Sequence, residues 1–224
     1  LFNGSIQPSE LAKLAIIIYL SFWLYSKQDV LNNIHFGLIP MTFILGSTAG
    51  LIFLQPDLSA TLTILMLGGL LFFLAGVDLR QIMLIMLGVL AIGAIFVAVS
   101  NTGQARITQY IAGLRDPVSA SYHIKRSIES IVNGGLFGVG IGRGSSKYGL
   151  PVSHTDSIFA VIAEETGLFG AGLVILLNII IMWRGLVIAS RAKDLLGKLL
   201  AAGLTLWISV EATLNMGVMV NLFP

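Results

Sequence analysis

Six long apolar runs separated by polar breaks limit what this chain can fold into. The runs cover residues 8–25, 37–54, 58–77, 82–100, 157–183 and 199–222. Each is near the ~20 residues that a helix needs to cross a bilayer, and a segment inside lipid must satisfy its own backbone hydrogen bonds. A transmembrane β-barrel would show short alternating segments instead. We therefore expect an all-α polytopic membrane protein, with residues 1–224 as one membrane domain.

The composition supports a membrane protein and excludes several other kinds of protein and site. Hydrophobic residues make up 56% of the chain and charged residues only 11%, whereas a soluble domain carries about a quarter charged residues. The absence of cysteine excludes disulfides and thiolate metal sites. The net charge is only +2, and we expect no nucleic-acid partner. The chain begins at Leu1 rather than Met and ends directly after an apolar run, so we expect a fragment of a longer protein.

Residues 101–156 form the one long stretch between apolar runs. Three isoleucines recur there at helical spacing: Ile124, Ile128 and Ile131. They predict a short amphipathic helix on the membrane surface, with Lys125 and Glu129 as an i,i+4 ion pair. A glycine-rich segment follows at 133–144, and its glycines would allow a close-packed loop. A nucleotide-binding loop is not expected, because it needs a strand before it and a helix after it.

Basic residues in the short connections predict the orientation of the spans. Lys27, Arg80 and a cluster at 184–198 lie on one side, whereas the opposite connection carries Asp57 and no cation. Since cytoplasmic loops are enriched in Lys and Arg, the first side is predicted to be cytoplasmic. The long loop is then extracytoplasmic.

Four cations of the long loop are candidate ligands for an anion: Lys125, Arg126, Arg143 and Lys147. Their place on the outer side runs against the usual charge bias, although long loops follow that bias only weakly. An anionic ligand at the outer surface would explain them.

Asp156 ends the loop immediately before the chain enters the next apolar run. A carboxylate at this boundary is a candidate proton acceptor, because a falling dielectric constant raises its pKa. Alternatively Asp156 is a helix N-cap, a position that favours Asp, with Ser157 starting the helix. Spacing alone leaves both interpretations open. A catalytic triad of Ser153, His154 and Asp156 is not expected, because residues so close in sequence rarely reach triad geometry.

Two further pairs of charged residues lie within the apolar runs. Glu164 and Glu165 are about two turns into a span. Because adjacent helical residues point ~100° apart, we expect one to be structural and the other to line a cavity. Glu10 and Lys13 are three residues apart and share a helix face. They either snorkel to the interface or form an intramembrane ion pair.

Seven segments form a series along nearly the whole chain: Gln7–Lys13, Gln55–Leu58, Asp116–Pro117, Asn133–Gly142, Leu150–Pro151, His154–Gly167 and Asn215–Gly217. In this order they resemble the RodA/FtsW/SpoVE family, the SEDS (shape, elongation, division and sporulation) proteins. The combination is highly specific, although each segment alone would be weak. One departure is Ser157, where the family usually has Phe.

The resemblance implies a fold of ten transmembrane helices, of which this chain supplies about six, the fourth to the ninth. Residues 101–156 correspond to the family's large extracytoplasmic loop. The implied function is a peptidoglycan glycosyltransferase of the bacterial cytoplasmic membrane that acts in cell elongation, division or sporulation. It joins the disaccharide units of lipid II and releases undecaprenyl pyrophosphate.

The family's essential aspartate corresponds to Asp156, which would act as the general base. The four loop cations would then stabilise the pyrophosphate leaving group, and a divalent cation, Mg²⁺ or Mn²⁺, is a further candidate for that role.

Two other functions remain open at this point. A lipid II flippase or transporter would need polar residues along a path across the bilayer, whereas here they concentrate at the predicted outer face. The family's association with class B penicillin-binding proteins makes a scaffold for such a transpeptidase the second alternative. A scaffold and an enzyme are compatible with each other.

Overall fold

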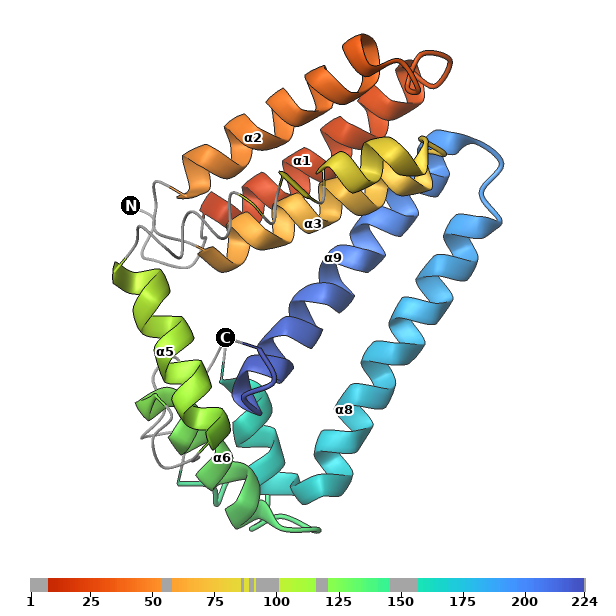
Figure 1. The fold of residues 1–224 in the computed structure, drawn as a ribbon. Coiled ribbons are helices and arrows are strands. Elements are labelled where there is room, and N and C mark those ends of the chain that lie inside the picture. The colour runs from red at the N-terminus through yellow and green to blue at the C-terminus, as the bar shows by residue number, and fades with distance from the viewer. Residues whose placement is uncertain are drawn as a thin grey trace, which may run out of the picture. The chain divides into compact units, whose positions relative to one another are not determined.

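The computed structural model describes residues 8–53, 58–85, 87–88, 91, 101–115, 121–145 and 157–223, and these ranges contain no strand. Their helices are α1 (Pro8–Ser26), the π-helix η1 (Ile34–Leu38), α2 (Ile39–Phe53), α3 (Leu58–Leu74), α5 (Asn101–Arg115), α6 (Tyr122–Gly134), α8 (Ile158–Ser190) and α9 (Leu195–Met219) (Figure 1). The predicted all-α class is confirmed.

Four helical stretches in the described ranges are long and apolar enough to cross a membrane: Pro8–Ser26, Ile34–Phe53, Ile158–Ser190 and Leu195–Met219. They correspond to four of the six predicted spans. The third prediction, 58–77, coincides with the shorter apolar helix α3 of 17 residues. The predicted span at 82–100 lies mostly outside the described residues. The chain is thus a multi-pass membrane protein.

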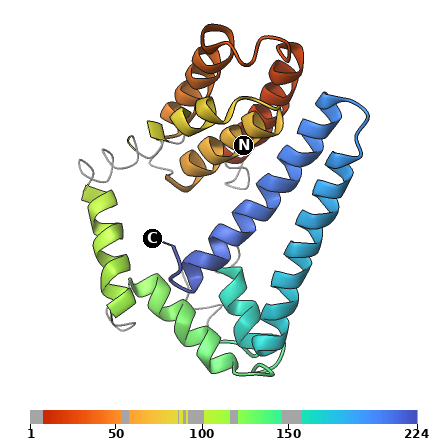
Figure 2. The ribbon, with the colours of Figure 1, turned by 45° about the vertical axis from the view of Figure 1, so that its right-hand side comes forward.

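The chain divides into two compact units. The first unit comprises residues 1–92 and 181–210, and the second comprises residues 93–180 and 211–224. Helices α8 and α9 contribute residues to both, and a short turn joins them (Figure 2).

Apolar packing between α1, α2 and α3 forms the core of the first unit. Leu20, Met41, Leu71 and Phe72 are completely buried in it. Helix α9 joins this core through Gly203, since a Cβ atom there would lie 2.7 Å from Ile17 Cγ2. A small residue at this point lets the two helix backbones approach closely.

A polar contact ties together the two predicted cytoplasmic turns of the first unit. The Asn32 side chain accepts a hydrogen bond from Asp78 N at 3.0 Å. The buried Gln81 side chain donates to the Asn32 carbonyl at 2.7 Å. The turn after α1 and the turn after α3 are therefore fixed to each other.

Helix α8 is much longer than the predicted run and contains a break. Its 33 residues would extend ~50 Å as a straight helix, compared with ~30 Å for the hydrocarbon core of a bilayer. Gly167 interrupts it with φ 70° and ψ −167°. The sequence did not predict this break, which separates a short first segment from the 23 residues 168–190.

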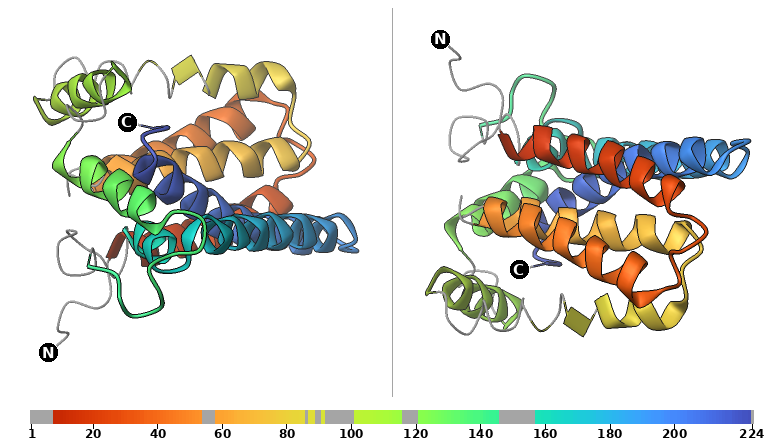
Figure 3. Two further views of the ribbon diagram at one scale, coloured as in Figure 1. Left: turned by 90° about the horizontal axis from the view of Figure 1, so that it is seen from below. Right: turned by 90° about the horizontal axis from the view of Figure 1, so that it is seen from above.

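Helix α6 confirms the predicted amphipathic helix. Ile124 is buried, and Ile131 packs against a cluster of buried residues of α8 and α9: Phe159, Ala163, Ala171 and Met219. The apolar stripe thus contacts protein at this point. Figure 3 shows α6 beside the first turns of α8. Helix α5 was not predicted. Its Tyr110 hydroxyl donates a hydrogen bond to the Leu222 carbonyl at 3.1 Å.

Candidate functional site

The glycine-rich loop that follows α6 binds the first segment of α8 through its amides. Val139 N donates to the Glu164 carbonyl at 3.0 Å, and Gly140 N donates to the Glu165 carbonyl at 3.1 Å. The last carbonyls of a helical segment have no partner inside the helix. The break at Gly167 creates such carbonyls, and the loop satisfies these two.

The same loop also binds the second segment of α8, now through its carbonyls. Leu168 N donates to the Gly135 carbonyl at 2.9 Å, and Phe169 N donates to the Leu136 carbonyl at 3.4 Å. These amides are the first of the new helical segment and would otherwise be unsatisfied. The loop therefore pairs with both sides of the break, an arrangement that we call the loop clasp (residues 134–145 with 163–169).

Two glycines of the loop clasp leave no room for a side chain. Gly138 has φ +79°, and a Cβ atom there would collide with the Glu165 carbonyl oxygen. Gly167 has φ +70°, and its Cβ atom would collide with the Leu136 carbonyl oxygen. Both positions combine a left-handed backbone with backbone contact, so they require glycine.

The carboxylates of Glu164 and Glu165 hold the end of the loop. Ser145 donates to Glu164 Oε1 from its amide at 3.4 Å and from its hydroxyl at 3.2 Å. Gly144 N donates to Glu165 Oε1 at 3.3 Å. The expected division, one structural and one lining a cavity, is not what the structure shows. Both side chains bind one segment, because Gly144 and Ser145 present donors to two adjacent helix positions.

Of the predicted cations on α6, Arg126 is already paired. Its guanidinium lies 3.1 Å from Glu129 Oε2 and 5.7 Å from the centre of the Tyr122 ring. The predicted Lys125–Glu129 pair is therefore wrong, because Arg126 takes the carboxylate. The hydrogen bond from Arg126 to the Tyr122 hydroxyl, with Glu129 as a second cause, raises the pKa of Arg126 above its ordinary value. The guanidinium is charged at any pH used in an assay.

Among the described residues, Lys125 and Arg143 differ from Arg126 in having no carboxylate partner. Within the described residues, no salt bridge joins either cation to an acid. Arg143 is exposed and follows a turn in which its amide donates to the Gly140 carbonyl at 3.0 Å. Lys147, the fourth predicted cation, lies outside the described residues.

Asp156, the predicted catalytic acid, also lies outside the described residues, but the residue that follows it does not. Ser157 is completely buried, and its hydroxyl lies 2.7 Å from His123 Nε2 of α6. The position at which the chain departs from the usual family residue thus holds a polar contact. His123 was not predicted as a functional residue; the one signal for it in the sequence is its place at the start of an amphipathic helix.

Glu10 and Lys13 form the ion pair that was one of the two predicted alternatives. Lys13 Nζ lies 2.6 Å from Glu10 Oε1, and the side chains are 2% and 42% exposed, respectively. Lys13 is thus buried in the first unit, with Glu10 at its edge.

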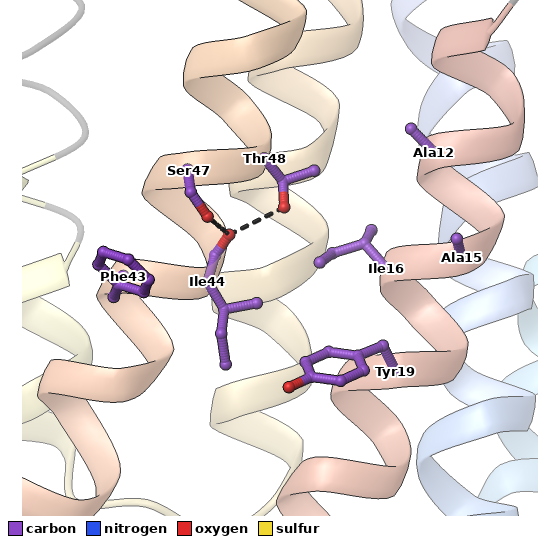
Figure 4. A pocket seen from close by; sticks show the side chains of 8 residues that line it. All are labelled: Ala12, Ala15, Ile16, Tyr19, Phe43, Ile44, Ser47 and Thr48. Atoms are coloured by element: carbon purple, nitrogen blue, oxygen red, sulfur yellow. Dashed lines mark hydrogen bonds between the residues drawn. The ribbon is translucent and has the colours of Figure 1, made fainter.

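An apolar groove of about 470 Å³ lies between α1 and α2 in the first unit. Its lining residues are Ala12, Ala15, Ile16, Tyr19, Phe43, Ile44, Ser47 and Thr48 (Figure 4). The Ser47 and Thr48 hydroxyls both donate to the Ile44 carbonyl. They therefore add little polarity to the groove.

A metal site is not apparent in the described part of the chain. No three His, Asp or Glu side chains gather there in a way that could hold an ion. The described residues do not fit a divalent cation bound by three such ligands.

Comparison with known proteins decides the family. A family model for FtsW, RodA and SpoVE, described as "Cell cycle protein", matches residues 2–224. The chain belongs to the FtsW/RodA/SpoVE family. It is 39% identical over 98% of its length to a probable peptidoglycan glycosyltransferase FtsW of Legionella pneumophila, of which it covers 57%.

Other relatives agree. The chain is 34% identical to the stage V sporulation protein E of Bacillus subtilis over 98% of its length and 60% of that protein. The whole chain also aligns with 62% of a solved chain from a study entitled "Structural coordination of polymerization and crosslinking by a peptidoglycan synthase complex", with a TM-score of 0.75 and 23% identity. That likeness confirms the fold. The chain spans 57% and 60% of the two curated relatives.

Proposed function

We propose that the protein containing this chain is a peptidoglycan glycosyltransferase that polymerises lipid II at the outer face of the bacterial cytoplasmic membrane. The observation that carries this proposal is membership of the FtsW/RodA/SpoVE family over residues 2–224, with relatives named as peptidoglycan glycosyltransferases at 39% and 34% identity.

In the proposed reaction Asp156 acts as the general base. It takes the proton from the 4-hydroxyl of the acceptor sugar while that oxygen attacks the anomeric carbon of the donor. A new glycosidic C–O bond forms, and the bond between the anomeric carbon and the pyrophosphate oxygen breaks. The pyrophosphate leaves with the electron pair, so it needs positive charge more than it needs a proton.

The loop clasp supports this assignment by holding one of the proposed cations. Arg143 comes directly before Gly144 and Ser145, whose amides are bound by Glu165 and Glu164. Those glutamates lie on the first segment of α8, and the chain reaches Asp156 just before that segment. The loop therefore holds the backbone next to Arg143 against the helical segment that follows Asp156 in the sequence.

The cations divide into two classes in this proposal. Arg143 and Lys125, which have no salt bridge within the described residues, are the preferred pyrophosphate ligands. Arg126 contributes less, because Glu129 at 3.1 Å already offsets its charge. Lys147 stays a candidate on sequence alone.

The proposal also includes a protein partner. The solved chain with the same fold comes from a complex described in terms of polymerisation and crosslinking, which supports a class B penicillin-binding protein as partner.

A divalent cation, Mg²⁺ or Mn²⁺, is retained as a hypothesis. Loss of polymerisation in EDTA, reversed by either ion, is the result that supports it.

The decisive test uses the complete protein, reconstituted in proteoliposomes with lipid II. We expect Asp156→Asn to lower the polymerisation rate at least ~100-fold, the range of general acid–base catalysis. Asp194→Asn is the matched control. Asp194 accepts from Gly197 N at 3.1 Å in the turn before α9, and its loss should leave the rate unchanged. An Asp156→Asn protein that polymerises at the normal rate would exclude Asp156 as the base.

A further inference from the structure

Two apolar side chains of the glycine-rich loop are exposed to an unusual extent. Ile141 is 86% exposed and Phe137 is 78% exposed, the highest values among the large hydrophobic side chains of the described residues. By comparison, Leu176 within the second segment of α8 is 51% exposed. Large apolar side chains held away from the protein core mark a surface that an apolar partner covers.

The ring of Phe137 joins the loop to the exposed surface of α8. It stacks on the Phe169 ring, with the ring centres 5.4 Å apart and the planes at 25°. Phe169 is itself 67% exposed, and its neighbour Leu168 is 61% exposed. The loop and the first turn of the second segment of α8 therefore present one continuous apolar surface in the second unit.

This surface lies at one end of a membrane span. Leu168 and Phe169 begin the 23 residues 168–190 of α8, which extend ~35 Å as a helix. That length matches the ~30 Å hydrocarbon core of a bilayer, and α8 is long and apolar enough to cross it. The first turn of the segment therefore lies where the hydrocarbon meets the headgroups, with Phe137 beside it.

The backbone of the loop suits such a position. An irregular segment can approach lipid only where its polar groups find partners inside the protein. Five amides of the loop donate to carbonyls of the second unit: those of Gly135, Gly138, Val139, Gly140 and Arg143. The last of these bonds closes the turn 140–143 at 3.0 Å, and Ile141 lies within that turn. The loop can therefore present apolar side chains to lipid without exposing these donors.

Arg143 makes the surface of the loop amphipathic. Its side chain is exposed, and it lies two residues after Ile141 in the same turn. Apolar side chains with a cation beside them are typical of segments in the membrane interface, where the cation reaches the lipid phosphates. A lipid leaflet matches both parts of this surface, and it also covers the exposed face of residues 168–190.

We propose that Phe137 and Ile141 insert into the lipid leaflet at this end of α8 and anchor the glycine-rich loop to the membrane surface. The orientation predicted from the basic residues makes this the outer leaflet. The loop clasp then has a second role beside joining the two segments of α8, because it holds the anchor at a fixed depth. This inference does not depend on the proposed reaction, since the bilayer is its ligand.

The experiment measures the depth of single nitroxide labels by their collisions with molecular oxygen, which concentrates in the hydrocarbon, and with a water-soluble nickel chelate. Phe137→Cys and Ile141→Cys are made in the complete protein after replacement of any cysteine outside residues 1–224, which contain none. The proteins are reconstituted in vesicles of phosphatidylethanolamine and phosphatidylglycerol. Both labels should lie ~5–10 Å into the boundary between headgroups and acyl chains, the depth of interfacial apolar side chains.

Two further labels calibrate the measurement. Leu176→Cys lies within the span and should report a deeper position than either loop label. Gln28→Cys lies in the exposed turn after α1, at the predicted cytoplasmic side, and should collide mainly with the chelate. If Phe137→Cys lowers the melting temperature through loss of the ring contact, Ile141→Cys still decides the question, because an 86% exposed side chain contributes little to packing.

Labels at positions 137 and 141 that collide with the chelate as often as the label at position 28 would overturn the anchor. Protection that appears only after addition of a class B penicillin-binding protein would overturn it too, and would assign the surface to a protein partner. Spin–spin broadening between labels at position 141 would instead assign the surface to a second copy of this chain. None of these outcomes depends on polymerisation, so the test of Asp156→Asn succeeds or fails separately.

Discussion

The two units of this protein are stabilised in different ways. In the first, α1, α2 and α3 bury large apolar side chains such as Leu20, Met41 and Phe72, an interaction that depends mainly on volume and area. In the second, the loop clasp depends on backbone hydrogen bonds at the break in α8 and on two buried or half-buried glutamates. The apolar core of the first unit should therefore tolerate many substitutions of similar volume. The loop clasp of the second unit should instead be sensitive to the addition or loss of a single atom.

Among the tests of this difference between the units, the largest effect is expected from adding one methyl group to the loop clasp. Gly138→Ala forces an alanine into φ +79° and against the Glu165 carbonyl, where the conformation alone costs ~1–2 kcal/mol. We expect the amides of Val139 and Gly140 to exchange at least ~10-fold faster with deuterium. The polymerisation rate of the complete protein should fall by a similar factor.

Gly69→Ala in α3 is the matched control from the first unit. A Cβ atom at Gly69 meets nothing within 4 Å, and alanine favours a helix by ~0.5–1 kcal/mol. Exchange and activity should remain at wild-type values. Equal responses of the two variants would remove the distinction between the units.

A smaller effect should separate the cations of the second unit. Arg143→Gln should raise the KM for lipid II ~10-fold, since a hydrogen bond to a charged group is worth ~1.5–3 kcal/mol. Arg126→Gln should raise it no more than ~3-fold, because Glu129 already pairs with that guanidinium at 3.1 Å. Arg191→Gln, at the predicted cytoplasmic side, is the control. A larger effect at Arg126 than at Arg143 would reverse the proposed order of the cations.

The same contrast explains what could be predicted from the sequence. Hydrophobic run length found α1, α2 and α9 nearly to their ends, because lipid and apolar packing impose one simple rule on many residues. The amphipathic stripe predicted α6. The spacing of Glu10 and Lys13 placed both on one helix face, which left their ion pair as one of two alternatives. The motif series found the family.

The contacts of the second unit could not be predicted in that way. The break at Gly167 depends on a carbonyl of the loop, more than twenty residues earlier in the chain, that leaves no room for a Cβ atom. The His123–Ser157 bond joins positions 34 apart, and no local period encodes such a distance. Arg126 displaced Lys125 as the partner of Glu129 because both spacings, i,i+3 and i,i+4, place a cation within reach.

The ion pair of Glu10 and Lys13 is one of the polar contacts in the otherwise apolar first unit, and it gives the last and smallest test. Glu10→Gln takes the carboxylate away from a lysine that is 2% exposed, which should destabilise the protein by ~1–3 kcal/mol. Replacing both residues, by Glu10→Gln and Lys13→Met, removes the buried charge as well and should cost less. Since ~1 kcal/mol shifts the melting temperature of a domain this size by ~2–4 °C, the difference is measurable in detergent. Lys193→Met, which removes an exposed lysine, should melt like the wild type. Equal melting temperatures of the single and double variants would mean that the ion pair does not stabilise the protein. The stability of the first unit would then come from apolar packing alone.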